Sequence, residues 1–147
     1  MKLFIMVLAL LSLLAVTALA GGEIPVKSSD DLLRHLQGNN FNIYLVHFYE
    51  SASRDKGVQA GNEDIQRSLK NVLKANPEFF SAKVDLSNKE LSRLGSVVGL
   101  NTTPAVLLIV HGKGVWLSGT NANLMIDRLR DFTPKFKQAS AHHSNPY

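Results

Sequence analysis

The 147-residue chain contains no cysteine. Disulfide bonds, thiol chemistry and zinc–thiolate sites are therefore excluded, and core packing alone has to hold the folded part together. The chain also lacks a glycine-rich phosphate loop, paired carboxylates at catalytic spacing and any cluster with the spacing of zinc ligands. The adjacent pair His142-His143 near the end is too little for a metal site. The sequence predicts no metal and no cofactor.

A strong excess of one charge is also missing, with 16 Lys and Arg against 12 Asp and Glu and a net charge of +4 at neutral pH. The basic residues are spread along the chain and form no cluster. A nucleic-acid-binding surface needs a concentrated basic patch. We therefore expect no nucleic-acid partner.

What the chain does have is an uncharged, largely apolar run at residues 3–20, which follows Lys2 and ends with Ala18 and Ala20 at the positions of a cleavage signal. This pattern is typical of a secretory signal peptide. The run is also near the lower length limit for a membrane span, so a retained anchor is the alternative. We expect a single folded domain over residues 21–137 and a disordered tail over residues 138–147, which are small and polar.

Hydrophobic periodicity predicts alternating helices and strands after residue 26. "VKSSDDLLRHLQG" predicts a helix capped by Ser28 or Ser29, and "FNIYLVHFY" a buried strand. A helix follows to Ala75, with a kink or a late start near Asn62. The remaining elements are the strand "FFSAKVDLS", the helix "NKELSRLGSVVG", the strands "PAVLLIV" and "VWLSG" around the turn "HGKG", and a helix that stops near Pro134. A short strand at 23–26 is expected before the first helix.

This order predicts an α/β fold, with a mixed sheet covered by helices on both faces. The chain from about residue 24 to residue 132 resembles a thioredoxin domain, most closely the protein disulfide isomerase type. "VHFYESASRDKG" matches the strand and the active-site bend of that family, "KVDLSNKELSRLGSVVGLNTTPAVLLI" its next strand, helix and proline-bearing loop, and "HGKGVWLSG" its hairpin. The resemblance implies the thioredoxin-like fold.

The resemblance also shows what this chain has lost. Aligned through Phe48-Tyr49, the two family cysteines fall on Ser53 and Lys56, the buried family acid falls on His47, and the helix-kinking proline falls on Gly61. A hydroxyl cannot exchange a disulfide, because the thiolate is the reacting species. The resemblance therefore implies a redox-inactive domain, and we expect no enzyme.

Thr103-Pro104 matches the cis-proline position of the family, where the main chain pairs with an extended peptide. The expected peptide site consists of Tyr49, Ser53, Thr103 and Pro104, with an apolar rim from Phe48, Tyr49 and Val98. Pro104 could equally serve only to shape its loop. Asn101 begins the sequon Asn-Thr-Thr, a possible glycan acceptor on the same loop. A glycan there would crowd the site, and the tight loop favours an unglycosylated Asn101.

Two other interpretations of the bend need separate treatment. Ser53-Arg54-Asp55-Lys56 spells Ser-x-x-Lys, in which lysine can act as the base for a serine nucleophile. The companion motifs of that enzyme class are absent, and we expect Ser53 or Asp55 to cap a helix instead. His47 has no thiol to serve as a proton shuttle, so we expect a hydrogen-bonded core histidine whose protonation loosens the bend in mild acid.

The sequence as a whole predicts a redox-inactive thioredoxin-like module of the secretory pathway, in the endoplasmic reticulum lumen or secreted. Its partner is a protein: either unfolded peptide, bound in a chaperone-like manner, or one fixed partner. The alternative is an accessory subunit of a larger assembly, anchored in a membrane through residues 3–20.

Overall fold

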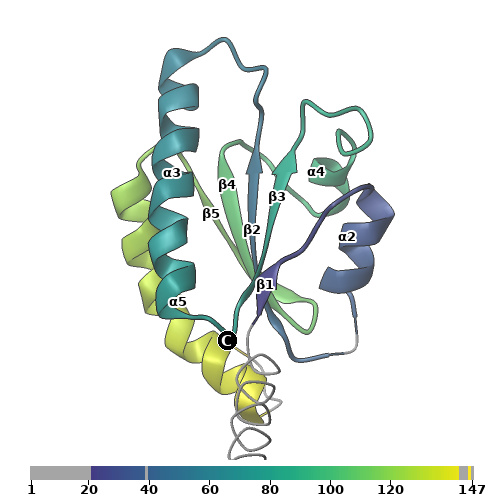
Figure 1. Ribbon diagram of the computed structural model, residues 1–147, viewed down its shortest axis with the longest axis vertical. Coiled ribbons are helices and arrows are strands. Elements are labelled where there is room, and N and C mark those ends of the chain that lie inside the picture. The colour runs from purple at the N-terminus through teal and green to yellow at the C-terminus, as the bar shows by residue number, and fades with distance from the viewer. Residues whose placement is uncertain (1–20, 39, 143–145, 147) are drawn as a thin grey trace, which may run out of the picture.

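The computed structural model describes residues 21–38, 40–142 and 146, and it shows a five-stranded mixed sheet between two layers of helices (Figure 1). The predicted α/β architecture is thereby confirmed. In chain order the elements are β1 (Gly22–Glu23), α2 (Ser29–Leu36), β2 (Ile43–Tyr49), α3 (Lys56–Ala75), β3 (Phe80–Asp85), α4 (Leu94–Val97), β4 (Ala105–Val110), β5 (Lys113–Ser118) and α5 (Ala122–His142).

The sheet has the order β1-β3-β2-β4-β5, with β2 at its centre. Strand β3 runs parallel to β2, whereas β4 runs antiparallel to it. The predicted turn joins β4 to β5 through His111 and Gly112, whose φ angles are 49° and 73°. Two consecutive positive φ values are typical of the tight hairpin turns that match the twist of antiparallel strands.

Strand β2 is buried on both faces, because successive side chains point to opposite sides of the sheet. Leu45 belongs to the core beneath α3 and α5, together with Ile65 and Leu129. Phe48 belongs to the second core, beneath α2 and α4, together with Leu32. Two separate apolar layers therefore fix the central strand, and they define where each β2 residue points.

The first two helices begin at side-chain caps. The Ser28 hydroxyl accepts a hydrogen bond from the Asp31 amide, and Asp55 caps α3 by accepting from the amides of Gly57 and Val58. Because α3 begins at Lys56, the expected late start near Asn62 is wrong.

Gly61 lies inside α3 at a close approach of two segments. A Cβ atom on Gly61 would lie 2.8 Å from the Cβ atom of Thr120, on the chain that leads into α5. Real Cβ atoms essentially never come this close, so a side chain would push α3 away from that segment. The close approach of Thr120 therefore requires a residue without a side chain at position 61.

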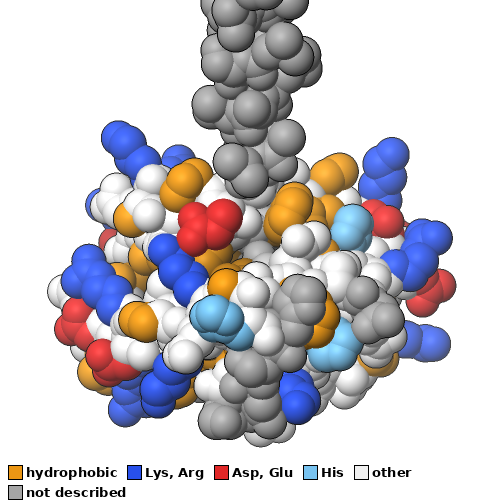
Figure 2. All heavy atoms as spheres, turned by 90° about the horizontal axis from the view of Figure 1, so that it is seen from below, with side chains coloured by type: hydrophobic (Ala, Val, Ile, Leu, Met, Phe, Trp, Pro, Cys, Tyr) orange, Lys and Arg blue, Asp and Glu red, His pale blue; other side chains and the backbone are white. Residues whose placement is uncertain are grey.

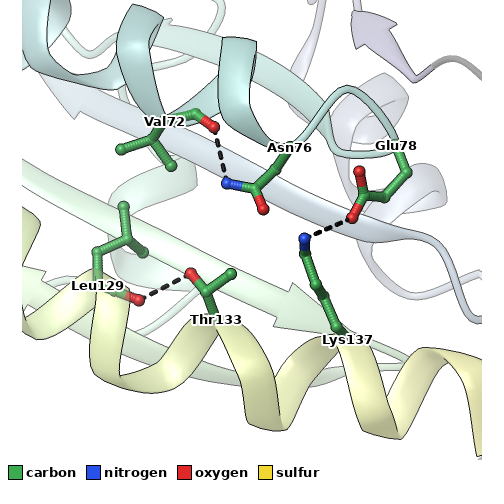
Figure 3. Close-up of polar contacts among 6 residues, drawn as sticks. All are labelled: Val72, Asn76, Glu78, Leu129, Thr133 and Lys137. Carbon is green, nitrogen blue, oxygen red and sulfur yellow. Dashed lines mark hydrogen bonds and ion pairs between the residues drawn. The ribbon is translucent and has the colours of Figure 1, made fainter.

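Helix α5 continues through Pro134 to His142, so the predicted stop near Pro134 is wrong. Figure 3 shows the helix running on from Leu129 past Lys137. Residues 138–142, which were expected to be disordered, are helical, and residues 143–145 and 147 lie outside the described residues. An interior proline costs a helix about 3 kcal/mol. Burial of Phe136 and Ala139 offsets this cost, and Lys137 adds an ion pair of 3.0 Å to Glu78.

Two other elements differ from their predicted bounds. The helix expected within residues 88–99 is helical only over Leu94–Val97, and the preceding residues form turns. The first strand pairs with β3 at Gly22 and Glu23, where a longer strand was expected at 23–26. The Ile24 amide still donates a hydrogen bond to the Ser81 carbonyl, but Pro25 comes next, and proline has no N–H to continue a ladder.

Figure 2 views the end of the molecule where the described chain begins, and its Lys and Arg side chains lie apart, with acidic and apolar ones between them. This face carries no concentrated basic patch. In the part of the chain that the structure describes, no helix is long and apolar enough to cross a membrane. Residues 1–20, with the predicted signal peptide or anchor, lie outside it.

Candidate functional site

Two segments meet at one edge of the sheet: the bend over residues 50–55, which follows β2, and the loop over residues 101–104, which precedes β4. Phe48 pairs with Ala105 in the antiparallel ladder. The residues just beyond this pair, Tyr49 on one strand and Pro104 on the other, therefore flank the same edge. The fold thus brings together the two parts of the predicted peptide site.

Asp85, at the end of β3, holds the bend in place. One of its carboxylate oxygens accepts hydrogen bonds from the amides of Ser51 and Ser87, each at 3.0 Å, and the other accepts from the Ser51 hydroxyl. The Ser87 hydroxyl in turn accepts from the Ala52 amide at 3.0 Å. Three of these hydrogen bonds therefore tie the bend to the end of β3 and the residues after it, and the fourth, from the Ser87 amide, lies within that segment.

The charge of Asp85 strengthens this arrangement. Partial burial by itself would raise the pKa of the Asp85 carboxyl, but the hydrogen bonds from Ser51 and Ser87 outweigh it and lower the pKa below its usual value. Tyr49 lies nearby, and burial, followed by the negative charge of Asp85, raises the pKa of its phenol. At neutral pH the bend is therefore held by an ionised carboxylate.

Sequence reasoning missed Asp85 and Ser51 as a pair. The carboxyl ends of parallel strands meet at one edge of a sheet, and β2 and β3 pair in parallel, with Tyr49 opposite Asp85. The sequence signal that could have predicted this pair was an Asp at the end of one strand and a Ser just beyond the end of the neighbouring parallel strand.

Ser53 precedes the start of α3, and Lys56 is the first residue of that helix. The Ser53 hydroxyl accepts a hydrogen bond from the Asp55 amide at 3.3 Å, and its carbonyl accepts from the Gln59 side chain. Lys56 is exposed at the first position of α3, and within the described chain no hydrogen bond joins it to Ser53. Asp55 is the helix cap, as one of the two predicted alternatives had it.

The Thr103–Pro104 peptide bond is cis, and Pro104 is buried. The Pro104 carbonyl accepts a hydrogen bond from the Gly119 amide at 3.1 Å. The main-chain N–H and C=O of Thr103 have no hydrogen-bond partner in the described part of the chain, and the residue is half-buried. Thr103 therefore keeps one donor and one acceptor that an extended peptide can use.

The apolar rim differs from the prediction. Phe48 is fully buried on the α2 side of the sheet, and its ring centroid lies 5.2 Å from that of Trp116. Phe48 therefore cannot line a site at the bend, because the side chains of β2 alternate between the faces. Tyr49 and Val98 are half-buried, and Val97 is 60% exposed at the end of α4.

His47 is buried, as predicted, but the prediction that it is hydrogen-bonded is wrong. The side chain is 1% exposed, and neither ring nitrogen has a hydrogen-bond partner among the described residues. Burial, and next the charge of Lys83, lower the pKa of His47 from 6.5 to about 4. The imidazole is therefore neutral at neutral pH, with one nitrogen as donor and the other as acceptor.

The remaining predicted positions are the possible glycan acceptor Asn101 and the pair His142-His143. Asn101 is exposed on its loop, so its side chain is accessible. His142 is exposed in the last turn of α5, and His143 lies outside the described residues. Among residues 21–38, 40–142 and 146, no group of three His, Asp or Glu side chains could hold a metal ion.

Comparison with solved structures shows the fold. The chain is similar to thioredoxin f2 of Chlamydomonas reinhardtii, at 16% identity and a TM-score of 0.60 over 78% of this chain and 97% of that one. It is similar to thioredoxin O2 of Arabidopsis thaliana, at 12% identity and 0.61 over 74% and 92%, and to Fasciola hepatica thioredoxin, at 20% and 0.55 over 71% and 93%. No protein-family model and no curated sequence matches the chain.

The chain therefore has the thioredoxin fold, spanning nearly the whole length of these thioredoxins. It has no cysteine with which to perform thiol–disulfide exchange. Fold and bend together define a redox-inactive thioredoxin-like module.

Proposed function

We propose that this protein binds other proteins in extended conformation at the edge formed by the bend and the loop. The observation that carries the proposal is the unpaired main chain of Thr103, which offers a donor and an acceptor at the edge of a rigid sheet. Main-chain pairing of this kind gives affinity with little sequence preference. This suits a chaperone-like module that holds unfolded peptide, or a module with one fixed partner.

We further propose that the chain is of the protein disulfide isomerase type and works in the secretory pathway, in the endoplasmic reticulum lumen or after secretion. The apolar run at residues 3–20 and its small residues at the expected cleavage positions support this placement. In this proposal the protein is not an enzyme, since the chain has no cysteine for thiol–disulfide exchange and the Ser53 hydroxyl accepts a hydrogen bond from the Asp55 amide.

The test is the aggregation of an unfolded client whose thiols are blocked, so that redox chemistry plays no part. We expect the protein to slow aggregation at near-stoichiometric amounts and Thr103→Pro to abolish this effect, because proline removes the N–H. Thr103→Ser keeps both main-chain groups and serves as the matched control. Thermal unfolding of each variant shows that it is folded. Equal protection by a folded Thr103→Pro variant contradicts the proposed site.

The second candidate function is an accessory subunit held at a membrane by its uncleaved N-terminal segment. The eighteen uncharged residues at 3–20 support it, since they approach the length of a membrane span. The intact mass of the native protein in mild detergent separates the two candidates. A chain that begins at Gly21 supports the lumenal or secreted module, whereas a chain that retains residues 1–20 supports the anchored subunit.

A further inference from the structure

A small cavity of about 40 Å³ lies between α3 and the strands β2 and β3, and His47 forms part of its wall. This volume admits a species of about the size of water, or slightly larger. The cavity is on the opposite side of the sheet from Phe48, and it is separate from the Thr103 main chain described above. Its polar wall residues are His47, Gln66, Lys70, Ser81 and Lys83.

The wall chemistry favours a negative ligand. It contains two lysines, an amide and a hydroxyl, and it contains no Asp or Glu. All of these groups can donate a hydrogen bond, and so can one nitrogen of the neutral His47 imidazole. The remaining wall residues are Leu45, Leu69, Leu73 and Ala82, so the rest of the wall is apolar.

His47 is the second observation that points to a ligand. A buried polar group without a hydrogen bond costs about 1 to 3 kcal/mol, so nearly all such groups in folded proteins have a partner. His47 is 1% exposed, and both of its ring nitrogens lack a partner among the described residues. A partner for its N–H therefore has to come from outside the described residues, and His47 lines a cavity in which such a partner can lie.

We propose that this cavity binds a small monovalent anion of the size of chloride, which accepts a hydrogen bond from the His47 imidazole and is attracted by Lys70 and Lys83. The proposal is independent of peptide binding at Thr103 and adds a second site to the protein.

The surrounding charges leave the cavity positive. Glu23 lies 4.0 Å from Lys83, but both side chains are about half exposed, so water screens this pair. Asp85 lies two residues beyond Lys83, and Ser51 and Ser87 already occupy its oxygens. Tyr49, whose ring centroid is 5.1 Å from that of His47, stays neutral at neutral pH. From β4 the residue opposite His47 is Val106, which carries no charge.

Anion binding and proton binding at His47 have to reinforce each other. An imidazolium beside Lys83 is unfavourable by itself, and an anion between them removes that repulsion. By linkage, the anion raises the pKa of His47, and protonation of His47 increases the affinity for the anion by the same factor. We therefore expect binding to tighten as the pH falls from 7 toward 5.

The experiment compares chloride and bromide with gluconate, which is too large for the cavity, at a constant ionic strength of about 0.15 M. The full chain is unfolded thermally at pH 7 and at pH 5.5 in each salt. We expect chloride and bromide to raise the Tm by a few degrees relative to gluconate, and by more at pH 5.5. NMR titration of His47 should show a higher pKa in chloride than in gluconate.

Lys70→Met and Lys83→Met remove one ammonium group each while keeping most of the side-chain stem. Both lysines are exposed, so we expect these variants to fold and to lose the halide-specific gain in Tm. Lys74→Met is the matched control, because Lys74 is exposed on the same helix and does not line the cavity. Equal Tm values in chloride and gluconate, or a gain that both cavity variants retain, overturn the proposal and leave the cavity as a site for water alone.

Discussion

The bend over residues 50–55 and the loop over residues 101–104 lie at the same edge of the sheet, yet their main chains are used in opposite ways. In the bend, the amides of Ser51 and Ala52 donate to the side chains of Asp85 and Ser87. In the loop, the main chain of Thr103 has no partner in the described chain. The main chain of the bend is therefore bonded within the protein itself, which we call closed, whereas the main chain at Thr103 is available to another chain, which we call open.

This difference separates what depends on side chains at this edge from what depends on the main chain. With Ser53 and Lys56 in the bend there is no thiol to react, yet the strand, the helix start and the bend are formed. The proposed binding at the loop depends on main-chain groups, and these do not change with the side chains. In the proposed function, recognition at the loop is therefore independent of the side chains in the bend.

The largest expected effect is the loss of folding stability in acid, which comes from His47 in the central strand. The folded protein keeps His47 neutral to about pH 4, whereas the unfolded chain takes up a proton near pH 6.5. The unfolded state therefore binds more protons in this window, and stability falls as the pH drops through it. The loss at His47 is about 1 kcal/mol by pH 5.5 and approaches about 3 kcal/mol below pH 4.

Denaturant unfolding of the wild type and of His47→Leu in gluconate, at pH 7, 5.5 and 4, measures this loss. We expect the leucine variant to lose much less stability across the window, because it removes the group that titrates. Protonation of Asp85 also lowers the free energy of unfolding in acid, and it does so in both proteins. The difference between the two pH curves therefore isolates His47. Parallel pH curves for both proteins contradict the assignment.

A smaller effect is expected from Asp85→Ala, which opens the closed segment. The substitution removes the acceptor for the amides of Ser51 and Ser87 and for the Ser51 hydroxyl. Because these groups are near the surface, water replaces part of the loss, and we expect a cost of roughly 1 to 3 kcal/mol. Hydrogen exchange should accelerate at Ser51 and Ala52. Asp131→Ala is the control, since Asp131 is exposed on α5. Unchanged exchange at the bend would mean that Asp85 does not hold it.

Most of the fold could be predicted from the sequence because its signals are local. Strand β2 and the hairpin turn at His111-Gly112 follow from short patterns, and both were found. The end of α5 could not be predicted from local patterns. A proline such as Pro134 normally ends a helix, but α5 continues because Phe136 is buried against residues that are distant in the sequence.

The candidate site shows the same limit. The positions of Ser53, Lys56 and Thr103 followed from the resemblance, and the structure places them at one edge. The role of Asp85 and the unpaired state of His47 depend on which side chains meet across strands, and this is decided by register. A sequence alone does not contain that register until the sheet order is known.

The smallest expected effect is at Ser53 itself, the position on which the resemblance to thioredoxin domains places a cysteine. Its hydroxyl accepts one long hydrogen bond of 3.3 Å from the Asp55 amide, and Asp55 caps α3 on its own account. Ser53→Ala should therefore change the free energy of unfolding by less than about 0.5 kcal/mol, and client protection should stay the same. Lys56→Ala should behave alike, since Lys56 is exposed. An electrophilic serine probe followed by mass spectrometry should leave Ser53 unlabelled. If Ser53 is labelled in the wild type and the label is lost in Lys56→Ala, the two residues act as a nucleophile and its base. The bend would then be a reactive site, which contradicts its description as a segment closed by hydrogen bonds to the protein itself.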